Sequence, residues 1–299
     1  MAMNWQIDDV PIFAAVVERN GISAAARHLG ISKSTVSKAL TRLEKGLGLK
    51  LVERNPRDLR VTSEGQAFYR RAQRILDEVA EANSIMSGLS GSPAGRVTAA
   101  MPFAFSREIL SPRLADFHRQ YPNVSLEILT CMRPADRVGN QADLAVVADA
   151  FTGSDLASRK LCEGRLIWVC APGYAAKLAP DPSVEALLPH VRVCEESHAR
   201  RMNVLVDGLR RRIDLGRDTT AINDPVSVRN VLQHGGGVSF LPEWYCRKAL
   251  QEGRLVQVCP HITFEDNAAT LSAVYPGRRR MPARVSALLD FLGEICAAL

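Results

Sequence analysis

Residues 12–65 read IFAAVVERNGISAAARHLGISKSTVSKALTRLEKGLGLKLVERNPRDLRVTSEG, and this stretch decides the fold of the N-terminal part of the chain. Apolar residues recur at helical spacing over residues 8–20, which predicts a first helix with an acidic start. After it, Ser23 is expected to cap a short alanine-rich helix that Gly30 ends. The pattern predicts short helices that meet at tight turns.

A third helix is expected at residues 33–46, with Ser32 as its N-cap. One face of this helix is apolar, and the opposite face carries hydroxyls and cations at Ser34, Ser37, Lys38, Thr41 and Lys45. Short hydroxyls can approach base edges in the major groove, while Lys and Arg reach phosphates. The face therefore suits a recognition helix, although an ordinary surface helix has the same pattern.

Two neighbouring features favour DNA binding over an ordinary surface. The small residues 24–26 allow two helices to cross closely, and residues 51–62, LVERNPRDLRVT, are typical of strand, turn and strand. Arg54, Arg57 and Arg60 then lie on a wing, where cations can follow the DNA backbone or minor groove.

The charge distribution supports the same interpretation. The chain has 299 residues and a net charge of +6, with 46% hydrophobic and 23% charged residues. Residues 19–74 hold 13 basic and 4 acidic residues, whereas residues 75–299 hold 25 of each sign. A polyanion-binding module joined to a neutral domain would have this distribution.

The stretch quoted above closely resembles the winged helix-turn-helix of LysR-type transcription regulators. The alanine triplet, the hydroxyl-rich helix, the LEKGLG turn, the LVER wing and the TSEG helix start occur in that family's order. The resemblance implies a DNA-binding domain at residues 5–62. It also implies that the DNA contacts include Ser23, Lys33, Ser34, Thr35, Ser37, Lys38, Arg42, Arg54, Arg57 and Arg60.

Residues 63–90 are expected to form a long linker helix that pairs two chains. Ser63 and Gln66 form a capping-box pattern at its start. Apolar or small residues then alternate in steps of four and three, as in a coiled-coil seam. A helix that packs only on its own domain is the alternative. The predicted dimer contacts are Phe68, Ala72, Ile75, Val79, Ala82, Met86 and Leu89, and a hinge at residues 91–95 follows.

From residue 96 onward, strands alternate with helices, which is typical of an α/β domain. Strands are expected at residues 96–101, 124–130 and 142–148, and a helix at residues 108–121. The region resembles, more loosely, the two-lobed periplasmic-binding-protein-like effector domain of the same family. On that resemblance, residues 96–163 and 268–299 form lobe one, and residues 166–265 form lobe two.

An effector is expected between the lobes, where strands end and helices begin. The predicted contacts are Pro102, Phe103, Ala104, Cys131, Met132, Arg133, His198, Asn223 and Asp224. Free amides and the Arg133 guanidinium favour a small organic acid. Alternatively, Arg133 points to solvent and Asp224 repels an anion. In that arrangement a neutral or cationic effector is expected.

Other functions are not supported by the sequence. The histidines lack metal-ligand spacing and no catalytic motif is present, so we expect no enzyme, metal or cofactor. Cys194 and His198 are four residues apart, which suggests either an activated thiol or a buried structural thiol. The arginine runs 210–212 and 278–280 suggest either an anion-binding site or a solvated surface. The seven cysteines include no Cys-x-x-Cys pair.

The expected location and partners follow from these observations. Residues 1–10 carry acidic side chains where a signal peptide has basic ones, and no apolar run is long enough to span a membrane, so a cytoplasmic protein is expected. A solute-binding protein for transport would need that signal peptide. The expected partners are double-stranded DNA, a small-molecule effector and further copies of the chain as homodimer or homotetramer, with RNA polymerase as a further candidate.

Overall fold

A computed structural model describes residues 5–55, 58–86, 92–148, 156–196, 202–215, 218–264, 269–277 and 281–299. The chain divides into two compact units, Met1–Gly95 and Arg96–Leu299. Each unit has its own hydrophobic core. None of the described helices is long and apolar enough to cross a membrane.

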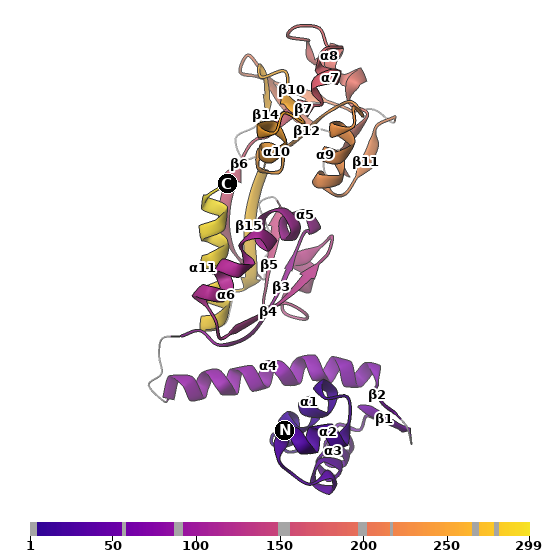
Figure 1. Cartoon of the computed structure of the whole chain (residues 1–299), viewed down its shortest axis with the longest axis vertical. Helices are drawn as coiled ribbons and strands as arrows, with labels where there is room; N and C mark the ends of the chain where they lie inside the picture. The colour runs from indigo at the N-terminus through magenta and orange to yellow at the C-terminus, as the bar shows by residue number, and fades with distance from the viewer. Residues whose placement is uncertain are drawn as a thin grey trace. The chain divides into compact units, whose positions relative to one another are not determined.

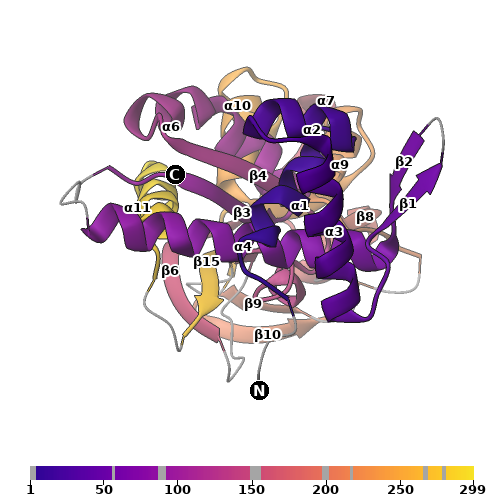
Figure 2. The same ribbon diagram turned by 90° about the horizontal axis from the view of Figure 1, so that it is seen from below.

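The first unit is a three-helix domain with a two-stranded wing and a long helix (Figure 2). In chain order its elements are α1 (Asp9–Glu18), α2 (Ile22–Leu29), α3 (Lys33–Leu47), β1 (Val52–Asn55), β2 (Asp58–Val61) and α4 (Ser63–Met86). The strands pair antiparallel, as the sequence predicts. Gly30 ends α2 in a left-handed conformation, and the Ser32 hydroxyl caps α3 by accepting from the Thr35 N–H at 3.1 Å.

Two predicted caps are wrong. Ser23 lies inside α2, which begins one residue earlier, after Gly21, and has no side-chain cap. At the start of α4, Thr62 caps the helix instead of Ser63, because its hydroxyl accepts from the Gly65 N–H at 2.9 Å. The Thr62 hydroxyl also donates to the Lys50 carbonyl, which ties the helix start to the beginning of the wing.

A buried carboxylate joins α3 to the wing. Glu44 is only 5% exposed and accepts hydrogen bonds from the Leu51 and Val52 N–H groups, at 2.9 and 3.2 Å, and from the Lys50 ammonium. Burial by itself would raise the pKa of the Glu44 carboxyl. The hydrogen bonds outweigh burial, so the pKa is lowered from its ordinary value and the side chain stays ionised.

The second unit has two lobes, and lobe one is built on a five-stranded sheet of order β4-β3-β5-β15-β6 (Figure 1). The strands are β3 (Gly95–Met101), β4 (Val124–Thr130), β5 (Leu144–Ala148), β6 (Leu156–Gly164) and β15 (Ala269–Pro276). The helical segments are α5 (Phe103–Phe105), a π-helical turn (Ser106–Leu110), 3-10 turns (Ser111–Arg113 and Pro134–Arg137), α6 (Leu114–Gln120) and α11 (Ala283–Ala297). The helix predicted at residues 108–121 therefore begins five residues earlier and changes type along its length.

Lobe two contains shorter strands and helices. Its strands are β7 (Leu166–Cys170), β8 (Val193–Glu195), β9 (Met202–Val206), β10 (Leu209–Ile213), β11 (Thr220–Ile222), β12 (Val238–Pro242), β13 (Val256–Gln257) and β14 (Ile262–Phe264). Its helices are α7 (Pro172–Ala175), α8 (Val184–Leu187) with a 3-10 turn (Leu188–His190), α9 (Pro225–Gln233) and α10 (Glu243–Gln251). Asp224 caps α9 by accepting from the Ser227 N–H at 3.0 Å, as predicted.

The chain passes between the lobes along β6 and β15, which pair antiparallel over most of their length. β6 leads into β7 of lobe two, and β15 returns after β14. At the junction, the Trp244 ring lies against Gly164 so closely that a Cβ there would stand 2.1 Å from the ring. A larger residue at Gly164 would displace the ring from the junction.

We predict that Glu44→Gln destabilises the wing by about 1–3 kcal/mol at pH 7, because a hydrogen-bonded carboxylate is replaced by a weaker acceptor. The folded-state pKa of Glu44 is lowered, so this stabilisation is present above the ordinary pKa and is lost as the pH falls through the lowered one. Hydrogen exchange of residues 51–52, read by mass spectrometry, measures the effect. Glu53→Gln is the control, and equal exchange in both variants at neutral pH would contradict the prediction.

Candidate functional site

The exposed face of α3 is a basic, hydroxyl-rich surface. Val36, Leu40 and Leu43 are buried in the first unit, so the opposite side of the helix is turned outward. On that side lies a groove lined by Ser37, Lys38, Thr41, Arg42, Lys45 and Gly46. The structure thus brings together the predicted Ser37 and Lys38, with Thr41 and Lys45 beside them.

The first turn of α3 holds a cluster of three hydroxyls. The Ser32 oxygen lies 2.7 Å from the Ser34 oxygen and 2.9 Å from the Thr35 oxygen. All three side chains are exposed, as is Lys33. The free N–H groups at a helix start attract anions, so this turn is suited to a DNA phosphate.

Arg42 has a structural contact that the sequence did not indicate. Its guanidinium donates to both carboxylate oxygens of Asp9, at 2.8 and 2.5 Å, and the Asp9 side chain is fully buried. The hydrogen bond to Asp9 raises the pKa of Arg42. Arg42 therefore joins α3 to α1. Its side chain is still 46% exposed and lines the α3 groove, so its contact with the DNA backbone stays a prediction.

The wing is described only in part. Arg60 lies on β2 opposite Glu53 and is exposed. Arg57 and the Arg54 side chain lie outside the described part of the chain. Ser23 is half-buried on α2 and does not belong to the α3 groove.

The predicted dimer seam divides into two parts. Ala72 is fully buried and Phe68 packs beside Phe13, so both belong to the core of their own domain. Ile75 is half-buried, whereas Val79 is 46% exposed although it is apolar. Of the remaining predicted positions, Leu89 and the side chains of Ala82 and Met86 lie outside the described residues.

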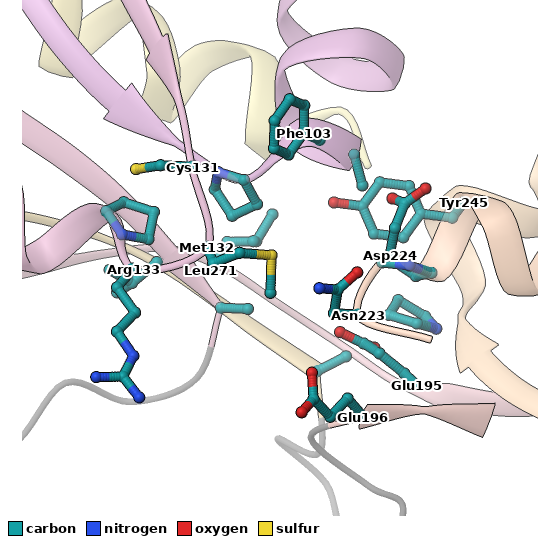
Figure 3. Close-up of a pocket in the computed structure, with 18 of the residues that line it drawn as sticks. Phe103, Cys131, Met132, Arg133, Glu195, Glu196, Asn223, Asp224, Tyr245 and Leu271 are labelled. Atoms are coloured by element: carbon teal, nitrogen blue, oxygen red, sulfur yellow. The ribbon is translucent and has the colours of Figure 1, made fainter. Parts of the chain in front are cut away.

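In the second unit, a cavity of about 680 Å³ lies between the lobes (Figure 3). It brings together eight residues of the predicted set, namely Pro102, Phe103, Ala104, Cys131, Met132, Arg133, Asn223 and Asp224. The ninth, His198, lies outside the described residues. Cavities of this size are typical of small-molecule sites.

The charge of the cavity differs from the expectation of an anion site. Among the described residues, four carboxylates line it, from Asp136, Glu195, Glu196 and Asp224, against one guanidinium, that of Arg133. Arg133 is exposed and, in Figure 3, extends away from the gap that Asp224 and Glu195 face. The cavity is therefore acidic.

Asp224 has one carboxylate oxygen without a partner among the described residues. Its Oδ2 accepts from the N–H and the hydroxyl of Ser227, at 3.0 and 2.6 Å. Its Oδ1 is buried and has no hydrogen-bond partner. A buried acceptor left unpaired costs about 1–3 kcal/mol, so a donor from a bound molecule would be favourable here.

Aromatic side chains supply the other feature of the cavity. Phe103 contributes from lobe one, and Trp244 and Tyr245 contribute from α10 of lobe two. Burial raises the pKa of the Tyr245 hydroxyl, and the charges of Glu195 and Asp224 raise it further. The hydroxyl is therefore protonated and available as a donor.

An ion pair between the lobes lies next to this cavity. Arg229 of α9 donates to Glu108 of lobe one at 2.9 Å and to the Tyr245 carbonyl at 2.6 Å. Burial opposes ionisation of Glu108, but the contact with Arg229 outweighs it and lowers the pKa of that carboxyl. Arg229 therefore links the two lobes.

The cavity is also lined by residues that the sequence patterns did not indicate, among them Glu195, Glu196, Trp244, Tyr245 and Leu271. The acidic pair could have been found, because it follows the strand-like run VRVC, and strand ends carry ligand sites. Trp244 and Tyr245 carry no such signal, since they lie on a helix with ordinary spacing.

The remaining suggested sites gain no support. Cys194 is fully buried, and burial raises its pKa to about 11, which fits a structural thiol. Arg210, Arg211 and Arg212 are exposed on β10, and Arg211 pairs with Glu185 at 3.4 Å. The run 278–280 lies outside the described residues. Within the described residues, no cluster of His, Cys, Asp and Glu could hold a metal ion.

Two family models match the chain in succession. A model described as bacterial regulatory helix-turn-helix protein, lysR family, matches residues 7–66. A model described as LysR substrate binding domain matches residues 90–297. The first contains the α3 groove, and the second contains the cavity.

Individual relatives give the same result. The HTH-type transcriptional regulator PtxR of Pseudomonas aeruginosa is 35% identical over 94% of this chain and 90% of its own length. The solved structure of CrgA, a LysR-type transcriptional regulator from Neisseria meningitidis, is 27% identical with a TM-score of 0.60, covering 97% of this chain and 98% of that one. The full-length virulence activator AphB of Vibrio cholerae is 22% identical over 96% of this chain and 98% of its own, with a TM-score of 0.58, and shares the fold. These relatives are regulators and not enzymes, and the chain belongs to the LysR family of DNA-binding transcription regulators.

Proposed function

We propose that this regulator responds to a small organic cation bound in the cavity between the two lobes. The observation that carries the proposal is the excess of carboxylates over guanidinium groups, four against one, among the described residues that line the cavity. A cationic ligand would be attracted by these charges, whereas the organic acid considered from the sequence would be repelled.

The details of the cavity support the same class of ligand. An ammonium or guanidinium group can donate to the unpaired Oδ1 of Asp224. The aromatic residues Phe103, Trp244 and Tyr245 line the cavity, and aromatic rings can attract cations in addition to giving apolar contact to a carbon skeleton. A neutral ligand would satisfy the apolar contacts but would gain no attraction from the carboxylates that line the cavity.

Binding would act on DNA through a change in lobe spacing. The lobes are joined by β6 and β15 and by the ion pair of Arg229 with Glu108. A ligand that binds the domain more tightly at one lobe spacing than at the other shifts the population of molecules toward the preferred spacing. Two-lobed domains commonly close by such hinge motions around their ligands.

The DNA contacts that we propose are those of the exposed α3 surface. Lys33, Ser34, Thr35, Ser37 and Lys38 would lie in the major groove, and Arg54, Arg57 and Arg60 of the wing along the neighbouring backbone. Two copies of the chain would pair through α4 beyond Phe68 and Ala72, starting from Ile75 and Val79. Pairing of dimers into tetramers, contact with RNA polymerase and a cytoplasmic location complete the proposal.

DNA binding should depend on Lys38 and Ser37 in different ways. Lys38→Ala removes one phosphate contact, so affinity falls for all sequences and the slope of log affinity against log salt decreases by about one. Ser37→Ala should relax sequence preference, because the hydroxyl faces base edges. Fluorescence anisotropy with selected DNA measures both, and Lys248→Ala on α10 is the control. Unchanged affinity and preference in both variants would rule out this surface.

Dimerisation should be lost on Val79→Glu. The exposed apolar side chain would meet its symmetry mate in the pair, and two carboxylates there would repel each other. Multi-angle light scattering of the full chain should report a smaller oligomer, while Glu78→Gln keeps the parent mass. The same mass for Val79→Glu and the parent would place the interface elsewhere.

Thermal unfolding of the full chain should identify the ligand class, because a ligand of the native state raises Tm. In a panel of organic cations, neutral molecules and carboxylates, a cation is expected to give the shift. Asp224→Asn keeps the cap on α9 but removes the charge of the carboxylate. Combined with Glu196→Gln, it should weaken binding of the cation about tenfold or more. Glu252→Gln, outside the cavity, should have no effect. A shift caused by carboxylates alone, or one unaffected by these variants, would refute the cationic ligand.

A further inference from the structure

The two lobes contribute different chemistry to the cavity. Lobe one supplies mainly apolar side chains, and its two charged residues there, Arg133 and Asp136, are opposite in sign and both exposed. Lobe two supplies three carboxylates, from Glu195, Glu196 and Asp224, and no cation among the described residues that line the cavity. The negative charge of this described lining therefore comes from lobe two.

The apolar surface that a ligand can reach lies on the opposite wall. Phe103 begins α5 and Met132 comes just after β4, and each side chain is 54% exposed although both are large and apolar. On the wall of lobe two, Tyr245 is only 5% exposed. Figure 3 shows Phe103 and Met132 across the gap from Asp224. A carbon skeleton packed against these two side chains would remove apolar surface from water, which is favourable.

The carboxylate of Asp224 indicates where a cationic head would lie. Ser227 holds its Oδ2 through the N–H at 3.0 Å and the hydroxyl at 2.6 Å, so the orientation of the carboxylate is fixed. The buried Oδ1 has no partner among the described residues, and only an N–H or O–H group can supply one. A primary ammonium combines positive charge with N–H donors, whereas a quaternary ammonium has the charge and no donor.

We propose that the cavity selects a primary amine with one apolar arm, whose ammonium lies at Asp224 of lobe two and whose arm packs on Phe103 and Met132 of lobe one. This inference rests on the proposed cationic ligand and narrows it to one chemical class. A second ammonium at the end of the arm would meet a wall with no net charge among its described residues, and would lose hydration without gaining a partner. Diamines are therefore disfavoured. Amino acids are disfavoured as well, because their carboxylate would stand close to those of lobe two.

The two ends of such a ligand contact different lobes, which ties its affinity to the lobe spacing. An amine with an apolar arm is bound best when both walls reach it, so it favours one spacing over others. An ammonium without the arm contacts lobe two alone and favours no spacing. The arm is therefore the part of the ligand that shifts the population of lobe spacings.

Isothermal titration calorimetry of the full chain with matched probes tests the proposal. Phenethylamine carries the head and the arm, ethylamine only the head, putrescine a second head, and trimethylated phenethylamine the arm and the charge without a donor. We expect phenethylamine to bind about tenfold or more tightly than each of the other three probes. A buried apolar arm and a hydrogen bond to a charged group each have an effect of that order.

Variants separate the contributions of the two walls. Phe103→Ala should reduce the preference for phenethylamine over ethylamine about tenfold, because it removes the contact of the arm. Asp224→Asn should weaken the binding of both amines, since it acts on the head. The exposed Phe103 side chain is not part of the buried core, so its truncation leaves the fold intact. Leu209→Ala on β10 is the control, because Leu209 is apolar, 68% exposed and outside the cavity.

The possible outcomes distinguish this inference from the proposed cationic ligand. If putrescine or the trimethylated probe binds as tightly as phenethylamine, or if Phe103→Ala behaves like Leu209→Ala, the inference is overturned and the cationic ligand stands. Hydrocinnamate has the same arm with a carboxylate as its head, and tighter binding of hydrocinnamate than of phenethylamine would overturn both. Binding of no amine at millimolar concentration would overturn the inference as well.

Discussion

The antiparallel pairing of β6 with β15 is the constraint on which the effector domain depends. These strands complete the sheet of lobe one, and their continuations are the paths to lobe two. Residues Ala269, Thr270 and Leu271, at the start of β15, line the cavity where the strands leave the sheet. The ladder therefore fixes one wall of the cavity, and any change in lobe spacing must bend the chain just beyond it. The contact of Trp244 with Gly164 and the pair of Arg229 with Glu108 are side-chain links across the same junction.

Charge separates the two binding functions of this chain. The basic excess lies in the first unit, where α3 exposes cations and hydroxyls, whereas the cavity of the second unit is acidic. A polyanion such as DNA is thus attracted to one unit and disfavoured at the ligand site of the other. Cations are disfavoured at the α3 surface by the same rule, so with the proposed cationic ligand each site would select against the ligand of the other.

Features that depend on neighbouring residues could be predicted from the sequence. The three short helices, the wing and the strands 96–101, 124–130 and 142–148 follow from local periodicity, and Gly30, Ser32 and Asp224 mark helix ends by their own chemistry. Caps were harder to assign, since Thr62 and Ser63 are equally suitable by type. Only the hydrogen bond of Thr62 to Lys50, across the wing, decides between them.

Contacts between distant segments could not be predicted. Nothing near Arg42 indicates that its partner is Asp9 on another helix, and nothing near Phe68 or Ala72 shows that they face their own domain. The negative charge of the cavity also depends on contacts between distant segments. Arg133 and Asp224 were both recognised, but Glu195 and Glu196 enter from a separate strand, and they make the cavity acidic.

Thermodynamic linkage between the two units tests the central claim most directly. The affinity of the full chain for a selected DNA fragment is measured by anisotropy with and without a saturating organic cation, and the affinity for that cation is measured by calorimetry with and without the DNA. A regulator whose cavity controls its DNA-binding domain must change both affinities by the same factor, because coupling is reciprocal. We expect a common factor of about 5–150, the usual range for coupled sites. If the cation binds equally well with and without DNA, and the DNA affinity is the same with and without the cation, the cavity does not control DNA binding. That result would contradict the proposed regulation.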